Sequence, residues 1–259
     1  MELGFIDEAF FAGRFKYLSM KLEGLPDARF GTKLGREIIR VNTSDPDTGK
    51  VITRRLSHSN PGWPDLYEIA SQRAFLERQL KCLKEQWSMC FRGSLEHVSS
   101  KYILMPNIHN PYNSDFWNAL VEDDCDIPKD YPVNYKGMVM RSQFEVETAK
   151  ILDSLGIEYK YEVRLKVGSN YYLYPDMGIN LPEFNRCGFV EVMGGLDNFR
   201  YITSNTNKIK NYMNIGLYPN RDIALICGDQ NYRPDPLTIK RIIGTMLSSI
   251  AVSHVYKKE

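Results

Sequence analysis

The alternation of apolar and polar residues is most regular in the second half of the chain. Between residues 142 and 155 the apolar positions recur at helical spacing, and Gly156 follows as a typical C-terminal residue. Residues 159–167 alternate between polar and apolar side chains, as a half-buried strand does. Three more strands are predicted at 171–174, 189–193 and 222–227, and two more helices at 197–215 and 236–250. The predicted order is αβββαβα, an α/β fold, in which Asp176 ends the second strand and a loop leads to the third.

The first half predicts a separate module made of a hairpin and a helix. Two β-rich runs, residues 35–41 and 51–56, flank the turn sequence Asp45-Pro-Asp-Thr-Gly-Lys. A long helix is expected from Asp65 to Cys90, with Asp65 as its N-cap and Glu68 completing a capping box. These patterns predict a hairpin packed with one amphipathic helix.

A connector rich in Pro, Asn and Tyr follows this module. It predicts one short helix from Ser114 to Val121, and an acidic run at residues 122–126 that we expect to be a solvated surface loop. The sequence thus divides into an N-terminal module at 1–112, a connector at 113–135 and an α/β domain at 136–259.

Composition excludes several classes of site. The five cysteines form no C-x-x-C pair and the four histidines are dispersed, so neither a zinc site nor a disulfide framework is indicated. No signal peptide is visible, and no segment approaches the roughly 18 apolar residues of a membrane span. We therefore expect a cytoplasmic protein with no membrane partner.

Charge is nearly balanced along the chain. Residues 1–130 hold 17 Lys and Arg against 19 Asp and Glu, and residues 131–259 hold 16 against 13. Non-specific nucleic-acid binders usually have a stronger basic excess, because phosphate neutralisation supplies most of their affinity. The overall charge permits a nucleic-acid partner without arguing for one.

Acidic residues from separate predicted elements come together at one sheet edge. Asp176 follows Pro175 at a strand end, and Glu191 lies within the third strand, among apolar neighbours. A carboxylate in so apolar a strand is costly to bury unpaired, so it calls for a metal or a basic partner. Oxygen ligands suit Mg²⁺ or Mn²⁺, and Glu145 in the preceding helix is a candidate to join them.

The residues 138–245 resemble the PD-(D/E)XK nuclease superfamily. The segment Arg141-Ser-Gln-Phe-Glu145 is similar to the R-S-x-x-E start of its first core helix, Pro175-Asp176 to the PD element, and Glu191-Val-Met193 to (D/E)-X-K. A further D-x3-Y-x6-K-x3-Y-x3-G pattern resembles a bacterial subgroup that carries E-H-F-G in place of E-X-K; here it comprises Asp197, Tyr201, Lys208, Tyr212 and Gly216.

This resemblance implies a restriction-endonuclease-like αβββαβ core and a metal-dependent nuclease. Asp176 and Glu191 would hold Mg²⁺ or Mn²⁺ with the Val192 carbonyl, and Glu145 would support a second metal or a water. The substrate would be DNA, with RNA also open, and the N-terminal module would grip or position it. Contacts to the nucleic acid are expected from Arg141, Lys210 and Tyr212. The oligomeric state is left open, with a dimer as one option.

The chain departs from the superfamily at its third-strand lysine, which is Met193 here. One alternative is loss of activity, which would leave a nuclease-fold module that binds nucleic acid or a protein. The other is relocation of the lysine to the following helix, where Asn205, Lys208 and Tyr212 share one face. If the opposite, apolar face (Ile202, Ile209 and Met213) docks on the sheet, Lys208 is expected to reach over the sheet edge.

Each candidate residue also has a purely structural interpretation. Glu145 completes a capping box with Ser142, and Asp176 after Pro175 suits a turn. Lys208 and Arg141 suit solvated surface positions, and Asp197 is expected to cap the helix that follows it. An unrelated α/β enzyme is a third reading, but no P-loop, G-x-G-x-x-G or G-x-S-x-G motif supports it.

Overall fold

The computed structural model describes residues 6–105, 109–122, 129, 132–169, 171–195, 198–229 and 231–258. It contains two compact units, one formed by the described residues of 1–13 and 89–259 and the other by residues 14–88. The boundaries fall inside helices α1 (Glu8–Glu23) and α2 (Trp63–Cys90). The expected boundary at residue 112 lies within the first unit, because β4 (Tyr102–Leu104) pairs with the C-terminal β13 (Val255–Lys257).

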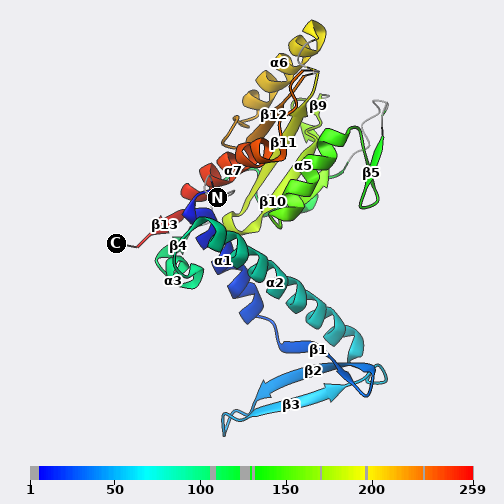
Figure 1. Ribbon diagram of the computed structural model, residues 1–259, viewed down its shortest axis with the longest axis vertical. Helices are drawn as coiled ribbons and strands as arrows, with labels where there is room; N and C mark the ends of the chain where they lie inside the picture. Colours follow the sequence, from blue (N-terminus) through cyan, green and yellow to red (C-terminus); the bar gives the residue numbers. More distant parts are fainter. Residues whose placement is uncertain are drawn as a thin grey trace. The chain divides into compact units, whose positions relative to one another are not determined.

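A four-stranded mixed sheet is the centre of the first unit (Figure 1). Its order is β12-β11-β10-β7; β10 pairs antiparallel with both β7 and β11, and β12 runs parallel to β11. The strands are β7 (Glu158–Tyr161), β10 (Met177–Leu181), β11 (Arg186–Met193) and β12 (Ile223–Cys227). All residues of β10 and β11 are buried. Both faces of these strands must therefore be covered by other elements.

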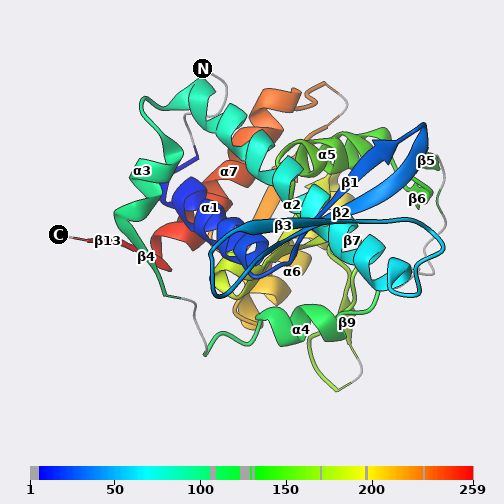
Figure 2. The ribbon, with the colours of Figure 1, turned by 90° about the horizontal axis from the view of Figure 1, so that it is seen from below.

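Helices cover the two faces of this sheet (Figure 2). On one face α5 (Gln143–Ser154) packs against α7 (Pro236–Val252), which also contacts β12. The other face carries α4 (Ser114–Ala119) and α6 (Phe199–Asn214). Trp117 of α4, Phe189 of β11 and Tyr212 of α6 share one apolar cluster there. The expected α/β class is confirmed, and the described part of the chain forms no barrel.

Side-chain caps begin α5 and α7, and both helices start within one residue of the positions that the sequence predicts. Ser142 caps α5 and accepts a hydrogen bond from the Glu145 N–H, and Asp235 caps α7 through the N–H groups of Leu237 and Thr238. Gly216, with φ of 82°, follows the end of α6 in the left-handed region that glycine favours. The predicted helix at 114–121 is also present, as α4.

Two strand predictions were wrong. The single strand expected at 159–167 is broken at Glu162, whose φ of 47° ends β7 before β8 (Leu165–Lys166) begins. β8 pairs with β9 (Tyr172–Leu173) in a small separate hairpin. The second core strand is β10, in the segment expected to be a loop, so Asp176 precedes a strand rather than ending one. The alternation of Met, Ile and Leu in β10 is obscured in the sequence by Gly178, Asn180 and Pro182.

The remaining elements of the first unit are short. They are α3 (Leu95–Ser100), β5 (Val133–Tyr135), β6 (Met138–Met140) and the 3₁₀ turn η1 (Pro182–Phe184). Within the described residues, no helix is long and apolar enough to cross a membrane.

The second unit packs a three-stranded antiparallel sheet on α2. The predicted hairpin is present as β2 (Arg36–Ser44) and β3 (Val51–Leu56), and β1 (Asp27–Lys33) adds a strand that the pattern did not reveal. Ala28 and Ile39 on one face of this sheet pack with Trp63 and Ala70 of α2. The helix begins at Trp63, so Asp65 lies in its first turn and is not the expected N-cap.

A buried ion pair joins β11 to the turn before β12. Arg186 Nη2 lies 2.6 Å from Asp222 Oδ1, and both side chains are almost fully buried. Asp222 Oδ2 also accepts from the Tyr218 N–H and from the exposed Arg221. The Asp222 carboxylate is therefore paired with one buried cation, Arg186, and one exposed cation, Arg221.

We predict that Arg186→Ala lowers the free energy of unfolding by about 3–5 kcal/mol, because it leaves the Asp222 charge buried without its enclosed partner. Arg221→Ala, which removes the exposed cation from the same carboxylate, should cost about 1 kcal/mol or less. Urea unfolding of both variants measures the difference. Equal losses of unfolding free energy in the two variants would show that the buried ion pair contributes no more to stability than the exposed one.

Candidate active site

The carboxylates of Asp176 and Glu191 lie on the same face of the central sheet. The register pairs Met177 with Val190, so the next position in each strand brings Asp176 opposite Glu191. Gly178 and Gly188 show which helices lie over each face of the sheet. A Cβ atom added to Gly178 would contact Leu120, next to α4, whereas one added to Gly188 would contact Met246 of α7. Because side chains alternate along a strand, Asp176 and Glu191 both point to the face that carries α4 and α6.

Backbone N–H groups at the end of the strand ladder hold Asp176 in place. Its main-chain oxygen accepts from the Glu162 N–H at 2.8 Å, and its Oδ2 accepts from the Val192 N–H at 2.6 Å. The carboxylate thus takes the place of a strand partner beyond the start of β10. Burial raises its pKa well above the ordinary value, and the Glu191 charge adds to this, while Lys208 opposes it.

Both oxygens of the buried Glu191 carboxylate are bound by side chains of α6. Oε1 lies 2.5 Å from Lys208 Nζ, and Oε2 accepts from the Tyr212 hydroxyl at 2.6 Å. Burial raises the pKa of Glu191, although Lys208 and Tyr212 work against that rise. The fully buried Tyr212 has a pKa raised well above its usual range, first by burial and then by Glu191, so it stays a neutral donor.

Lys208 connects the two sides of the site. Its ammonium also donates to the Tyr174 carbonyl at 3.0 Å, just before Asp176. Burial lowers the pKa of Lys208, but the charges of Glu191 and Asp176 outweigh that effect and the net pKa is raised. Lys208 is therefore a charged group at neutral pH.

The orientation of α6 is the reverse of the expected one. Its polar face, with Asn205 and Tyr212 buried, packs toward the sheet, whereas Ile202 and Met213 are 41 % and 44 % exposed. The expected docking of the apolar face was therefore wrong. Glu191 offers the polar face of α6 a buried charge to pair with. That face therefore turns inward, and Lys208 reaches Glu191.

Glu145 lies in the first turn of α5 and is also a neighbour of the two carboxylates. Its N–H donates to Ser142 Oγ, and its carboxylate accepts from the Arg141 N–H at 2.9 Å and from the Tyr161 hydroxyl at 2.7 Å. Half of the expected capping box is thus present: Ser142 caps the Glu145 N–H, but the Glu145 carboxylate accepts from the N–H of Arg141 and not from that of Ser142. Burial is the main cause that raises the pKa of Asp176 and Glu191, and the Glu145 charge adds to it for both. This position in the first turn of α5 leaves Glu145 close enough to influence the site.

A cavity of about 400 Å³ opens beside these groups. Its walls include Glu145, Val192 and Tyr201 together with Arg141, Tyr232 and Arg233. Burial and the charges of Asp176 and Glu191 raise the pKa of Tyr201, which places this residue near both carboxylates. The site therefore adjoins a hollow with cationic and aromatic walls.

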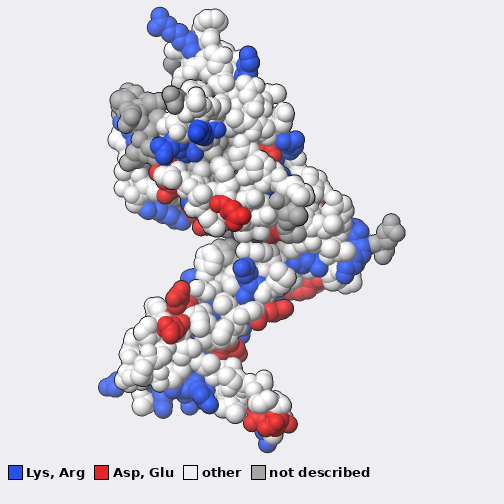
Figure 3. All heavy atoms as spheres, turned by 180° about the vertical axis from the view of Figure 1, so that it is seen from behind, with Lys and Arg blue, Asp and Glu red and all other residues white. Residues whose placement is uncertain are grey.

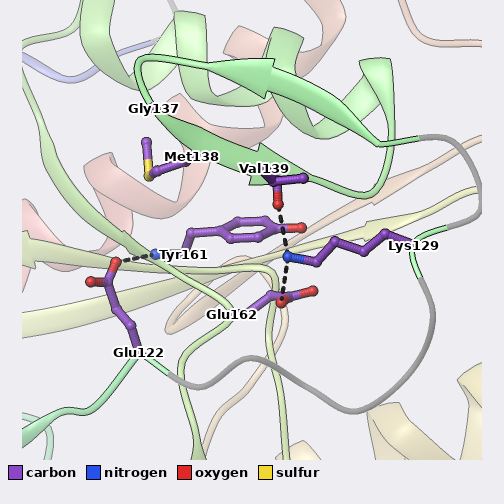
Figure 4. A pocket seen from close by; sticks show the side chains of 7 residues that line it. All are labelled: Glu122, Lys129, Gly137, Met138, Val139, Tyr161 and Glu162. Carbon is purple, nitrogen blue, oxygen red and sulfur yellow. Dashed lines mark hydrogen bonds and ion pairs between the residues drawn. The ribbon is translucent and has the colours of Figure 1, made fainter.

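A second buried carboxylate, Glu162, is neutralised separately. Arg141 Nε lies 2.5 Å and Lys129 Nζ 3.5 Å from it. Figure 4 shows Lys129 between Glu162 and the Val139 carbonyl, with the Tyr161 ring beside it, in a cavity of about 620 Å³. Arg141 is thus already engaged by an acidic partner.

The three expected nucleic-acid contacts have different surroundings. Tyr212 is 1 % exposed and holds Glu191, so the expectation that it contacts nucleic acid is corrected to a positioning role. Arg141 lines the 400 Å³ cavity while paired with Glu162. Lys210 is exposed on α6. For Arg141 and Lys210 the contact to nucleic acid stays a prediction.

Some expectations fall outside the described residues. Asp197, expected to cap α6, is among them, and the described N-cap is Asn198, whose side chain accepts from the Arg200 N–H. Residues 123–126 of the acidic run lie outside as well. Glu122 is described, and its carboxylate accepts from the Tyr161 N–H at 2.9 Å.

Sequence reasoning missed the hydroxyl groups that hold the carboxylates. Tyr161, 16 residues after Glu145, gave no local signal of their contact, because helix and strand meet through the fold. The 21-residue separation of Tyr212 and Glu191 hid their bond in the same way. The recurrence of Tyr201, Lys208 and Tyr212 along one helix face was the available signal.

Among the described residues, no group of three or more His, Cys, Asp or Glu side chains is arranged to hold a metal ion. Comparisons of the chain with protein-family models, with curated proteins and with solved structures found no match. Function must therefore be argued from the geometry and charge of the Asp176–Glu191–Lys208 site itself.

The raised carboxyl pKa values predict an unusual pH dependence for the metal-free protein. Asp176 binds its proton more tightly when folded than when unfolded, so stability falls as pH rises from the ordinary value of 3.8 toward the raised folded pKa. Acidification from pH 7 to pH 5 should then raise the melting temperature. Asp176→Asn should raise it at pH 7 and weaken its pH dependence, whereas the exposed Asp115→Asn should change neither. A melting curve that is identical for Asp176→Asn and the wild type would contradict this.

Proposed function

We propose that this protein is a divalent-metal-dependent phosphodiesterase that cleaves DNA, with RNA as a further candidate substrate. The observation that carries the proposal is the pair of carboxylates, Asp176 and Glu191, on one sheet face, with Lys208 bound to Glu191 at 2.5 Å. Two carboxylates can hold a cation that activates a water for attack on a phosphodiester, and a charged lysine can orient that water.

The charge balance of the site fits a cation. Besides burial, the main cause, Glu191 and Glu145 raise the pKa of Asp176, and Glu145 also raises that of Glu191; among the described residues, Lys208 is the one cation that forms an ion pair with any of the three. Asp176 Oδ1 has no hydrogen bond or ion pair within the described part of the chain. Carboxyl groups whose pKa is raised by burial and by neighbouring negative charge gain from a divalent ion, because it offsets that repulsion.

Mg²⁺ or Mn²⁺ would be held by Asp176 Oδ1 and Glu191, with the Val192 carbonyl as a third oxygen. When bound, the cation would lower the pKa of a water molecule and offset charge that grows on the phosphate. Glu145 would add negative charge behind the pair and anchor a further water. Tyr212 keeps Glu191 oriented through its 2.6 Å hydrogen bond, so the ligand geometry does not depend on the metal alone.

Lys208 would act as a positioning and charge-stabilising group. Its raised pKa means that it carries a proton at neutral pH and cannot accept one from water. It can instead orient the attacking water and stabilise negative charge on the phosphate oxygens. In this proposal it takes the role of the superfamily lysine whose place is occupied by the buried Met193.

The order of the elements that build the central sheet supports membership of the PD-(D/E)XK superfamily. Helix α5, strands β7, β10 and β11, helix α6, strand β12 and helix α7 give αβββαβα, with the small β8–β9 hairpin inserted. The PD dipeptide stands immediately before the second of these strands and Glu191 lies in the third. We propose that this is a restriction-endonuclease-like core.

A catalytically inactive module that binds nucleic acid or a protein is the second candidate. It is favoured by Met193 and by the close Lys208–Glu191 pair, which already satisfies one ligand oxygen. The two candidates differ in metal affinity, because an inactive site has no need of a divalent ion. Calorimetric titration with Mn²⁺ distinguishes them: heat that is lost in Asp176→Ala supports the enzyme, and no heat in the wild type supports the inactive module.

Asp176→Ala should abolish Mn²⁺-dependent cleavage of duplex and single-stranded DNA without unfolding the protein, since it removes a partly exposed carboxylate at the start of a strand. Cleavage is measured on end-labelled substrates with Mn²⁺ or with EDTA, and folding by circular dichroism. Asp115→Ala, on the exposed side of α4, is the matched control and should cleave normally. Unchanged activity in Asp176→Ala would mean that the cleaving site lies elsewhere.

Lys208→Met should lower the turnover number by about 10²–10⁴, the usual contribution of a water-orienting or proton-transfer group. Lys166→Met, at an exposed position in β8, should have no effect on turnover. Met193→Lys adds an ammonium on the same side of β11 as Glu191, and should partly restore turnover in the Lys208→Met background. Full activity of Lys208→Met would end the proposed role of this lysine.

A further inference from the structure

The second unit is basic, although the first half of the chain is not. Residues 14–88 hold 14 Lys and Arg against 9 Asp and Glu, whereas residues 1–130 as a whole are slightly acidic. Half of these cations belong to the strands and turns of the sheet β1–β2–β3; they are Arg29, Lys33, Arg36, Arg40, Lys50, Arg54 and Arg55. Balanced charge along the chain therefore conceals a local excess.

Three arginines form a row across this sheet. The register pairs Arg29 of β1 with Arg40 of β2, and Arg40 with Arg55 of β3. Directly opposed residues of adjacent strands lie about 4.5–5.5 Å apart, and like charges at that spacing destabilise a sheet. A row of three such residues weakens the fold and requires another explanation.

Arg40 and Arg55 point away from the helix that covers the sheet, whereas Arg29, on the edge strand β1, reaches Glu77 of α2. Ile39, the neighbour of Arg40, is fully buried against Trp63 and Ala70 of α2, so alternation turns Arg40 to the opposite face. Lys33 and Arg36, paired at the end of β1 and β2, share the parity of Arg29 and Arg40 and lie on that same face. Figure 3 shows Lys and Arg side chains gathered over this sheet. We call these five residues the arginine face.

Most of the arginine face has no acidic partner among the residues that the structure describes. Arg29 pairs with Asp27 at 2.7 Å and with Glu77 at 3.4 Å, but Arg40 and Arg55 form no ion pair with any described residue. Arg40 lies across the sheet: a Cβ on Gly31 of β1 would come within 2.9 Å of its Nε. Gly31 thus leaves room for the guanidinium group to lie flat over the neighbouring strand.

We propose that the arginine face binds the phosphate backbone of duplex DNA. Strands spaced about 4.8 Å apart set the guanidinium groups over a span of roughly 10 Å, which suits two or three phosphates of one DNA strand. The planar fork of arginine binds phosphate through two parallel hydrogen bonds, which explains arginine rather than lysine at all three row positions. The phosphates would also remove the repulsion within the row.

This proposal rests on the proposed function for the choice of DNA as ligand. It assigns non-specific affinity to the second unit and leaves cleavage to the Asp176–Glu191 site. Binding and cleavage can consequently be measured apart, because phosphate contacts need no divalent metal.

The test uses the full chain, a labelled 20-base-pair duplex and EDTA, with fluorescence anisotropy between 50 and 200 mM salt. Arg40→Ala/Arg55→Ala should weaken binding by about tenfold or more, and should reduce the slope of log K against log salt by about 2, one for each lost phosphate contact. Arg78→Ala/Lys81→Ala removes the same charge from the exposed side of α2 in the same unit and should bind like the wild type.

Folding does not confound the comparison, because relieving repulsion should leave the melting temperature of Arg40→Ala/Arg55→Ala unchanged or raised. Arg40→Lys/Arg55→Lys keeps the charge and should retain most of the salt slope. The proposal for the arginine face would be overturned if the two alanine double variants bound DNA with equal affinity, or if the wild type bound no duplex. It would also be overturned if the protein bound phosphatidylserine vesicles but not DNA. Binding without Mn²⁺-dependent cleavage would refute the proposed enzyme and leave the arginine face standing.

Discussion

The ion pair between Lys208 and Glu191 is the interaction on which the candidate site depends. Glu191 lies in a strand whose residues are all buried, where an unpaired charge would cost several kcal/mol. Lys208 and Tyr212 bind its two oxygens from successive turns of α6, which turns the polar face of this helix inward. One buried charge thus fixes the orientation of a helix and leaves its apolar residues, Ile202 and Met213, partly exposed.

The same site carries an energetic cost that Lys208 offsets only in part. Asp176 stands opposite Glu191 on the same face, and burial with this neighbour raises its pKa. A protein selected for stability alone would replace such a pair with apolar residues, which often pack at no loss of free energy. Retained repulsion between carboxylates with raised pKa values is characteristic of sites where a ligand supplies the missing charge. The energetics of the site therefore favour a bound cation independently of the sequence motif.

The sequence predicted those parts of the fold that local pattern controls. Helix α5 begins at the cap Ser142, and the buried run around Glu191 is a strand, because caps and apolar runs act over a few residues. β10 was missed since Gly178 and Asn180 interrupt its alternation, and only pairing with β7 and β11 stabilises it. The inward face of α6 was predicted wrongly because apolar periodicity carries no information about a buried charge elsewhere in the chain.

The pairing of strands also decides what the charges of the second unit mean. Arg29, Arg40 and Arg55 are 11 and 15 residues apart in the sequence, and no window along the chain reveals them as a group. The register aligns them in one row, and the missing strand β1 supplies its first member. Cross-strand repulsion would favour shifting this register by one residue, but that shift would move Ile39 out of the core with Trp63. Burial of one face therefore enforces the arginine row on the other, and an anionic ligand is the partner that would make this arrangement favourable.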